Sequence, residues 1–440
     1  MSRVVYTALL RLFAPVIWLW MRVRAGRYVV DWQILRMSRF GIYQAVASKS
    51  RTVGPVWIHA VSLGETRAAQ PLIQALLDEG LPVLLTHTTP TGRAEGGRLF
   101  GTAMASGQLR QTWLPYDFPG SVRRFLKHYV PRCGILIERE VWPNLIHEAH
   151  RAGVPMALVS ARLSDQGFRR SRWARRALHG AYGALHLVLA QTEADADRLR
   201  QLGALEPHVM GNLKFDIALP SNQMDAGRQW KQSLVRPTIA VASTRDGEEE
   251  MFATAILNAD QSVPARVLHM LIPRHPQRFG NVATILQQHG LTFVRRSAGA
   301  EMLLPEMPVL LGDTLGEMAF YYAAADVAII GGGFAPLGGQ NLIEACAAGT
   351  PVIVGPHMHN FVQATQDAIA AGAAIQVKDA AQALHTSYDL LRDAHRLGTM
   401  REAALAWTAA HTGATARILQ ALRPLLRHST ERPEVPRCRL

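Results

Sequence analysis

Charged side chains follow several short apolar runs of the sequence, where buried strands are expected to end. Glu65, in HAVSLGETRAAQ at residues 59–70, opens a predicted helix and could remove a proton from an acceptor hydroxyl. Glu138 and Glu140 lie two residues apart in IEREVWPN and point the same way on an extended segment. Lys214, in GNLKFD, could stabilise charge that develops on a leaving phosphate. The plainer alternatives are a helix-dipole acid for Glu65, a solvated strand end for the two glutamates and a surface cation for Lys214.

A second group of residues is suited to holding an anion. The stretch IPRHPQRF presents Arg274 and His275 between Pro273 and Pro276, directly after an apolar run. The prolines restrict the loop and so lower the entropic cost of aiming the arginine. A guanidinium offers a two-pronged set of donors to a phosphate, so we expect an anion clamp here.

Residues 327–361 form the stretch around which the chain is organised. An apolar run at 327–330 ends in three glycines, which let the backbone approach a ligand closely. Asn341 is the predicted N-cap of a helix, and Glu344 lies one turn inside it. The helix start could hold a phosphate and the carboxylate could bind ribose hydroxyls, which predicts a nucleotide. The alternative is an ordinary strand–helix–strand crossover, because the stretch has neither GxxxxGK[ST] nor a clean GxGxxG.

Two further helix starts belong to the same half of the chain. GEM at residues 316–318 begins a predicted helix beside this pocket, and Met318 could lie against a flat base. Three acids at 248–250 fill the first turn of another helix, where the dipole favours them, so we interpret them as capping residues.

The elements that must position these residues alternate between strands and helices. Short apolar runs separated by helical patterns predict parallel sheets covered on both faces. They are expected at 56–60, 83–88, 111–114, 135–137, 156–159, 187–190, 238–242, 267–271, 291–294, 309–311, 327–330 and 351–354. We predict an α/β chain with two Rossmann-like, doubly wound domains at 31–222 and 223–427, the second closed by helices at 380–426, and a tail at 428–440. Ligands would bind at the carboxyl ends of the strands, in a cleft between the domains.

The N-terminal segment predicts a membrane anchor within residues 1–30. Residues 4–20 are almost all apolar, and Arg22, Arg24 and Arg27 follow, which would keep the rest of the chain on the cytoplasmic side. The segment is marginal for a span, since about 20 residues are needed, so it could span the membrane or lie in its interface. The alternative is a hydrophobic helix packed on the protein.

Composition limits the partners. The chain of 440 residues is 48% hydrophobic and 18% charged, which is typical of globular domains, and its net charge of +13 favours acidic partners. A basic stretch at 168–176, FRRSRWARR, would align Arg169, Arg172 and Arg176 on one side of a helix beside Trp173 and face an anionic membrane or a phosphorylated lipid. A solvated basic helix is the alternative. The aromatic residues expected on basic strands of a nucleic-acid-binding protein are not seen, so we expect no nucleic acid.

The sequence also predicts no metal and no cofactor. There is no HExxH and no DxD in a predicted loop. The three cysteines, Cys133, Cys346 and Cys438, fit neither a disulfide framework nor a zinc site and favour a reducing compartment.

Taken together, the motifs resemble the 3-deoxy-D-manno-octulosonic acid (Kdo) transferase family. The resemblance rests on HAVSLGETRAAQPLI, IEREVWPNLI, SARLSD, GNLKFD, IPRHPQRF, GEMAFYYAAADVAIIGGGF, GGQNLIEACAAGTPVIVGP and HMHNF. It implies a two-domain GT-B glycosyltransferase that inverts the anomeric centre, with CMP-Kdo as donor and the lipid A precursor lipid IV-A as acceptor. It also implies a place on the cytoplasmic side of the inner membrane.

The resemblance implies roles for individual positions. Glu65 resembles the general base, and Glu138 and Lys214 resemble the stabilising positions, with Glu140 as an alternative to Glu138. Arg67 would face the acceptor. The CMP contacts would be Pro273, Arg274, Gly316, Glu317, Met318, Asn341, Leu342, Ile343 and Glu344. Other interpretations are a GT-B enzyme that uses a UDP-sugar and a membrane-tethered nucleic-acid-binding protein.

Overall fold

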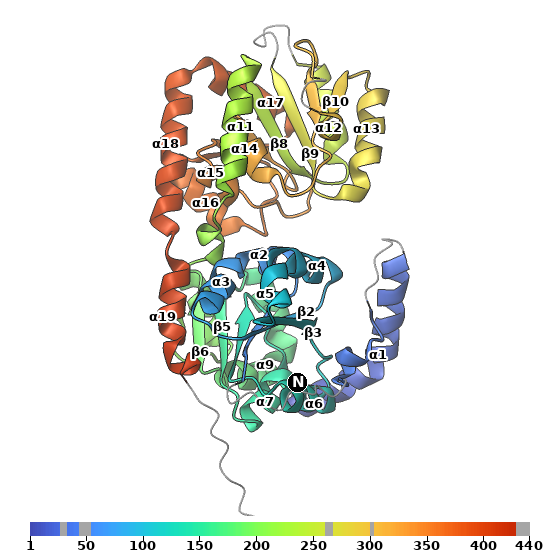
Figure 1. Cartoon of the computed structure of the whole chain (residues 1–440), viewed down its shortest axis with the longest axis vertical. Helices are drawn as coiled ribbons and strands as arrows, with labels where there is room; N and C mark the ends of the chain where they lie inside the picture. The colour runs from blue at the N-terminus through green and yellow to red at the C-terminus, as the bar shows by residue number, and fades with distance from the viewer. Residues whose placement is uncertain (27–32, 44–53, 260–266, 300–302, 428–440) are drawn as a thin grey trace, which may run out of the picture. The chain divides into compact units, whose positions relative to one another are not determined.

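The computed structural model describes residues 1–26, 33–43, 54–259, 267–299 and 303–427. The chain divides into two compact units (Figure 1). The first comprises Met1–Ile217 and the chain from Gly413 onward, and the second comprises Ala218–Thr412. Within the described residues, each unit contains one parallel sheet of seven strands. The predicted class, two doubly wound α/β units, is therefore confirmed.

The first sheet has the strand order β3-β2-β1-β4-β5-β6-β7. Its inner strands are short apolar runs with every side chain buried, as expected for a parallel sheet covered on both faces. The strands are β1 Val56–His59, β2 Val83–His87, β3 Leu109–Trp113, β4 Cys133–Ile137, β5 Met156–Ala161, β6 Leu187–Ala190 and β7 His208–Val209.

Helices cover both faces of this sheet. Two clusters of buried apolar side chains lie on opposite faces, because successive residues of a strand point to opposite sides. The helical segments of the unit are α1 Arg3–Gly26, η1 Met37–Phe40, α2 Leu63–Ala68, α3 Gln70–Asp78, α4 Pro90–Leu99, α5 Gly101–Ala105, α6 Pro119–Tyr129, α7 Pro143–Arg151, α8 Asp165–Ser171, η2 Arg172–Ala174, α9 Arg175–Gly183, α10 Glu193–Gln201, η3 Leu213–Asp216 and α19 Ala414–Leu426.

The second sheet has the order β10-β11-β9-β8-β12-β13-β14. Its strands are β8 Thr238–Thr244, β9 Leu268–Pro273, β10 Phe293–Arg295, β11 Val309–Leu311, β12 Val327–Ile330, β13 Val352–Val354 and β14 Ala374–Gln376. Its helical segments are α11 Ser221–Leu234, α12 Glu248–Leu257, η4 Pro276–Arg278, α13 Phe279–Gln288, η5 Arg296–Ala298, α14 Met318–Ala324, α15 Ile343–Ala347, α16 Val362–Ala370, α17 Ala380–Arg392 and α18 Ala394–His411. One face packs on α12, α13 and α17, and the other on α11 and α14.

Each sheet has a switch point where the strand order reverses. In the first unit β1 and β4 are neighbours, and in the second unit β8 and β12 are neighbours. Ligands of open α/β sheets bind at the carboxyl ends of the strands at such points. Of the predicted site residues, Glu65 follows β1 and Glu138 follows β4. Strands β7 and β14 were not predicted, because both are very short edge strands, with both side chains of β7 exposed and only the first side chain of β14 buried.

The units differ from the predicted domain ranges at three places, of which the first is that α1, predicted as a separate anchor segment, belongs to the first unit. The first unit ends at Ile217 rather than at residue 222, and α19 belongs to the first unit rather than to the second. Ile418 and Leu422 of α19 are buried in the core on one face of the first sheet. Asp216 accepts hydrogen bonds from the backbone N–H groups of Gly413 and Thr415 and so caps the start of α19. The predicted tail at 428–440 lies outside the described residues.

The expected N-terminal anchor corresponds to helix α1. Helix α1 contains a segment, Arg3–Val23, of mean hydropathy 1.7 that is long and apolar enough to cross a membrane, and little of it is buried. This ability to cross a membrane is inferred from length and composition alone.

The basic stretch at 168–176 does not form the single helix that was predicted, because a 3-10 turn at Arg172–Ala174 separates α8 from α9. The predicted alignment of Arg169, Arg172 and Arg176 on one helix is therefore wrong.

We expect Leu422→Ala to destabilise the first unit by about 2–5 kcal/mol, because it would leave a cavity in a close-packed core. Hydrogen exchange on the full chain would show lost protection in β1 and β4, with the strands of the second unit unchanged. Leu405→Ala on α18 is the matched control, because that leucine is 47% exposed. Equal loss of protection in both sheets would contradict the assignment of α19 to the first unit.

Candidate active site

Glu65 lies just beyond the carboxyl end of β1, in the first turn of α2. The Oγ atom of Ser62 accepts a hydrogen bond from the Glu65 backbone N–H, which places the glutamate at a capped helix start. Its Oε2 accepts a hydrogen bond from the Val61 N–H at 2.6 Å. Burial, and then the charges of Glu138 and Glu140, raise the pKa of Glu65 to about 8. A carboxyl group with a pKa in this range is suited to general acid–base catalysis.

Glu138 lies at the end of the neighbouring strand β4 and is held between two cations. Its Oε1 is 2.6 Å from Nζ of Lys214, and its Oε2 is 2.6 Å from Nε of Arg162. Burial opposes ionisation, but the charges and hydrogen bonds of Lys214 and Arg162 outweigh it and lower the pKa of Glu138 to about 2. The carboxylate is therefore charged at neutral pH.

The backbone at Glu138 is strained. Its φ angle is 61°, in the left-handed region that residues other than glycine rarely adopt. Ser160, near the end of β5, has a φ angle of 49°. Such conformations persist only where the surroundings enforce them, and they cluster at functional sites. Here the Arg162 N–H also donates to the Glu138 carbonyl at 3.2 Å, so the backbone and the side chain of Glu138 are fixed by the same arginine.

The structure separates the two glutamates that the sequence left as alternatives. Glu140 accepts a hydrogen bond from Trp142 Nε1 at 3.0 Å, and burial raises its pKa. Glu138, in contrast, forms ion pairs with Lys214 and Arg162. Of the two glutamates considered for the stabilising position, Glu138 is the one that forms an ion pair with Lys214.

Lys214 forms an ion pair with Glu138 although the lysine follows β7, the edge strand of the sheet. It lies in η3, where Oδ1 of Asn212 accepts a hydrogen bond from the Lys214 N–H at 3.0 Å and fixes the turn. Leu213 beside it is fully buried and anchors the turn in the core. Glu65, Glu138 and Lys214 therefore belong to one group in the first unit, in which the charge of Glu138 raises the pKa of Glu65 and the charge of Lys214 lowers it.

The predicted anion clamp lies at the carboxyl ends of β8 and β9 in the second unit. The Arg274 N–H donates to the Thr244 carbonyl at 2.9 Å, which ties the loop to β8. Burial lowers the pKa of His275, and the neighbouring charges of Arg245, Arg274 and Arg278 lower it further. Three arginines thus lie near this loop, although one of them, Arg278, is already ion-paired with Asp246 at 2.5 Å and with Glu249 at 3.0 Å.

The glycine loop after β12 is held by a residue that was interpreted only as a capping acid. Glu248 is fully buried, and its carboxylate accepts backbone hydrogen bonds from Gly332 at 2.6 Å, Phe334 at 2.9 Å and Ala335 at 3.2 Å. Gly332 has a φ angle of 76°, which glycine adopts without steric cost. These N–H groups already have an anionic partner, so the glycine loop is a structural support rather than a ready phosphate cradle.

The helix predicted to start at Asn341 is shorter than expected. Helix α15 covers only Ile343–Ala347, and Asn341 precedes it. Oδ1 of Asn341 still accepts a hydrogen bond from the Ile343 N–H at 3.2 Å, while its Nδ2 donates to Glu344 Oε1 at 3.0 Å. So short a helix has a small dipole, so the expectation that it binds phosphate is weakened. Glu344 is fixed in place, as binding a ribose would require.

Other predicted nucleotide contacts lie around the same strand ends. Burial raises the pKa of Tyr322, a buried tyrosine of α14 that was not predicted, the charge of Glu344 raises it further, and the charge of Arg274 lowers it. Glu317 forms an ion pair with Arg296 at 3.1 Å. Met318 begins α14 and packs partly against the buried cluster on that face of the sheet.

The residues predicted to face the acceptor or membrane are only partly placed. Arg67 forms an ion pair with Glu95 at 2.6 Å. Arg169 and Arg176 are exposed, and Trp173 is 66% exposed. The side chain of Arg172 lies outside the described part of the structure. Among the described ranges, no group of three or more His, Cys, Asp or Glu side chains could hold a metal ion.

The sequence analysis missed the roles of Arg162 and Glu248. Arg162 lies in SARLSD, a string that contributed to the resemblance without being assigned a role. Its position directly after β5, the neighbour of β4, was the available signal. Glu248 was one of three adjacent acids, and nothing local distinguishes it from the other two.

We expect Arg162→Met to lower the free energy of unfolding by about 3 kcal/mol, because removing one partner of a buried ion pair leaves the other charge undercompensated. The control is Arg98→Met, whose arginine also pairs with a buried glutamate but is 59% exposed, against 27% for Arg162. That change should cost less than about 1 kcal/mol. Denaturant titration would measure both, and equal stability of the two variants would contradict the bracing role of Arg162.

Comparison with known proteins shows the family of this chain. Residues 36–217 match the family model described as 3-Deoxy-D-manno-octulosonic-acid transferase (kdotransferase). The chain is 60% identical to the 3-deoxy-D-manno-octulosonic acid transferase of Bordetella pertussis over 96% of this chain and 99% of the relative. It is 32% identical to the protein of the same name from Haemophilus influenzae, over 97% and 99% of the two chains.

Two solved structures share the fold. A UDP-GlcNAc 2-epimerase from Neisseria meningitidis aligns with a TM-score of 0.56 at 16% identity over 84% of this chain and 100% of its own. A glycosyltransferase from Rickettsia africae aligns with a TM-score of 0.55 at 13% identity over 85% and 100%. At these identities the likeness concerns the GT-B fold alone. The identity to the Bordetella protein extends over nearly the full length of both chains and shows more than the fold. This chain belongs to the 3-deoxy-D-manno-octulosonic acid transferase family and is a glycosyltransferase that transfers Kdo.

Proposed function

We propose that the protein transfers Kdo from CMP-Kdo to lipid IV-A, with inversion at the anomeric carbon and without a metal ion. The observation that carries this proposal is the buried group at the ends of β1 and β4. There a glutamate with a raised pKa lies beside a permanently charged carboxylate and its two cations. Glu65 can accept a proton, while Glu138 holds the two cations in place.

In the proposed reaction, Glu65 removes the proton from a hydroxyl of the acceptor sugar. The oxygen then forms a bond to the anomeric carbon of Kdo, and the bond from that carbon to the CMP phosphate breaks. The electron pair leaves with CMP. Lys214 stabilises negative charge near the reacting centre, and Glu138 and Arg162 hold the lysine in position.

The second unit supplies the donor site in this proposal. Arg274 and the neighbouring basic side chains neutralise the CMP phosphate, which a metal ion does in some other transferases. Glu344, oriented by Asn341, accepts hydrogen bonds from the ribose hydroxyls. Pro273, Gly316, Glu317 and Met318 complete the walls. Positive side chains supply the charge neutralisation, so we expect no cofactor.

The proposed acceptor places the enzyme at the cytoplasmic side of the inner membrane. Lipid IV-A is held in a bilayer, and the apolar helix α1 gives the chain a means of staying there. The exposed Trp173 and the arginines of α8 and α9 would face the same lipid surface.

We expect the purified chain, incubated with CMP-Kdo and lipid IV-A, to give a lipid product heavier by one or more Kdo units in mass spectrometry. CMP should raise the thermal unfolding temperature more than UDP, and Arg274→Gln should abolish that difference. Replacing CMP-Kdo by UDP-N-acetylglucosamine should give no product. Transfer from the UDP-sugar, or stabilisation by UDP alone, would overturn the assignment of the donor.

We expect kcat/KM to rise with pH through about 8, because a general base acts only when deprotonated and Glu65 retains its proton up to that pH. Glu65→Gln should lower kcat by about 10²–10⁴-fold and remove this limb of the profile. Glu193→Ala, at an exposed position, is the control and should have normal activity. A profile that instead rises near 4.5, the ordinary value for the group, would contradict the proposed base.

A further inference from the structure

The first two turns of α1 are held to the folded first unit by polar contacts. Nη1 of Arg3 donates to Oδ1 of Asn144 at 3.1 Å, and the hydroxyl of Thr7 donates to the same oxygen at 3.0 Å. Tyr6 forms a hydrogen bond with Asp117, a buried carboxylate that also accepts hydrogen bonds from the backbone at the start of α7. Leaving these buried groups without partners would be unfavourable, so the contacts oppose separation of α1 from the unit.

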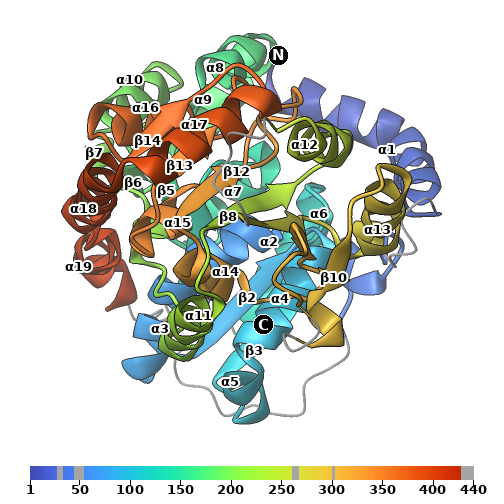
Figure 2. The same ribbon diagram turned by 90° about the horizontal axis from the view of Figure 1, so that it is seen from above.

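The N-terminus itself lies against the same unit. The ammonium group of Met1 donates to the Trp173 carbonyl at 3.2 Å, and the Met1 carbonyl accepts from the Ala177 N–H at 3.0 Å. Figure 2 shows the N-terminus beside α8 and α9. The beginning of α1 is therefore in contact with the unit that follows it in the chain.

Packing continues along the helix. Ala14 is buried, and the ring of Trp18 lies 5.4 Å from that of Phe40 and 5.7 Å from that of Tyr116. The contacts from Tyr6 to Trp18 extend over about 18 Å of helix at 1.5 Å per residue. The remaining turns reach only about 12 Å further, well short of the roughly 30 Å of a bilayer core.

The opposite face of α1 is apolar and uncovered. Its exposed side chains are Val4, Val5, Leu9, Leu12, Phe13, Val16, Leu19, Trp20 and Val23. A contiguous surface of this kind on a docked helix is typical of an interaction site. The helix contains no acidic residue, and its cations are Arg3, Arg11, Arg22 and Arg24.

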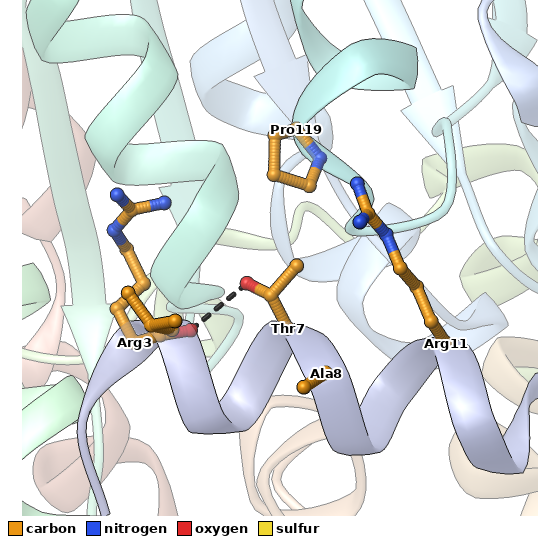
Figure 3. Close-up of a pocket in the computed structure, with 6 residues that line it drawn as sticks. Arg3, Thr7, Ala8, Arg11 and Pro119 are labelled. Carbon is orange, nitrogen blue, oxygen red and sulfur yellow. Dashed lines mark hydrogen bonds between the residues drawn. The ribbon is translucent and has the colours of Figure 1, made fainter.

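Two of these cations line a hollow between α1 and the start of α6. Arg3 and Arg11 stand on either side of Thr7, and Pro119 lies opposite (Figure 3). The hollow has a volume of about 210 Å³, and Val4 and Ala8 complete its apolar side. A second hollow of about 340 Å³, lined by Arg175, Arg176 and His179, lies on α9, which contacts the N-terminal end of α1. A charged rim beside an apolar face matches an anionic phospholipid, with its phosphate above its acyl chains.

We propose that α1 lies in the plane of the membrane interface instead of crossing the bilayer. Its apolar face enters the acyl boundary, the first unit remains attached to its other face, and the hollow between Arg3 and Arg11 takes a phospholipid phosphate. This inference rests on the membrane location within the proposed function and specifies how the membrane is bound. The position of Arg11 supports it, because a spanning helix would carry that charge into the hydrocarbon core.

The orientation can be tested by cysteine labelling of membrane vesicles of both orientations. Cys133 and Cys346 are buried, so Cys438→Ser gives a suitable background for the full chain. Ser2→Cys reports on the start of α1, and Ser106→Cys, exposed after α5, reports on the folded unit. A membrane-impermeant maleimide should label both cysteines from the same side. Labelling from opposite sides would show that α1 spans the membrane and would overturn the proposal.

The phosphate hollow can be tested by flotation with vesicles of phosphatidylcholine and phosphatidylglycerol. Arg11→Gln should weaken binding about fivefold relative to the wild-type chain. Arg110→Gln, which removes an exposed arginine of β3, is the matched control and should leave binding unchanged. Equal binding of the two variants would overturn the assignment of the hollow, as would displacement by inorganic phosphate beyond that by chloride at matched ionic strength.

Failure of the chain to float, with self-association that Val16→Asp abolishes, would instead make the apolar face an interface between two copies and overturn the proposal. Neither readout involves Kdo transfer. Same-side labelling without transfer from CMP-Kdo would therefore leave the membrane inference intact and remove the proposed donor and acceptor. Transfer from CMP-Kdo together with opposite-side labelling would overturn the membrane inference and leave the proposed donor and acceptor intact.

Discussion

The candidate site depends on one buried carboxylate that is kept ionised. Glu138 could not remain charged in a dry environment without Lys214 and Arg162, since desolvation alone would favour its protonated form. The charge of Glu138 also helps to raise the pKa of Glu65, which follows the neighbouring strand β1. The two glutamates are therefore driven to opposite protonation behaviour by one arrangement. Separation of this kind is the general means by which a protein assigns different acid–base roles to chemically identical groups.

The second unit uses a buried glutamate in a related way, at the equivalent place in its sheet. Glu248 follows β8 as Glu65 follows β1, and it fixes the loop after the adjacent strand β12. Glu249 next to it is also buried, and it pairs with Arg278 at 3.0 Å. In the second unit this carboxylate therefore ties the end of β8 to the loop after β12, which is distant in sequence. The position of the ligand-binding loops thus depends on electrostatics as well as on the hydrophobic core.

In the proposed membrane arrangement, attachment of α1 to the first unit would connect the candidate site with the lipid surface. Asp117 caps α7 and binds Tyr6 of α1, and α7 is the helix that follows the strand carrying Glu138. If α1 lies in the membrane interface as proposed, a helix fixed in this way would hold the sheet of the first unit at a set distance from the lipid surface. Such an arrangement suits an acceptor whose sugar is confined to the headgroup region.

The sequence by itself determined the class of the fold and most of the strands, because short β-branched runs separated by amphipathic segments have few other stable arrangements. It also gave the positions of Glu65, Glu138, Lys214 and Arg274, since each directly follows or closely trails a strand. Only the tertiary structure decided which of Glu138 and Glu140 meets Lys214, that Arg162 braces the pair, that Glu248 holds the glycine loop and that α19 returns to the first unit. These facts depend on contacts between segments far apart in the chain, and burial and partner charges arise only when those segments meet.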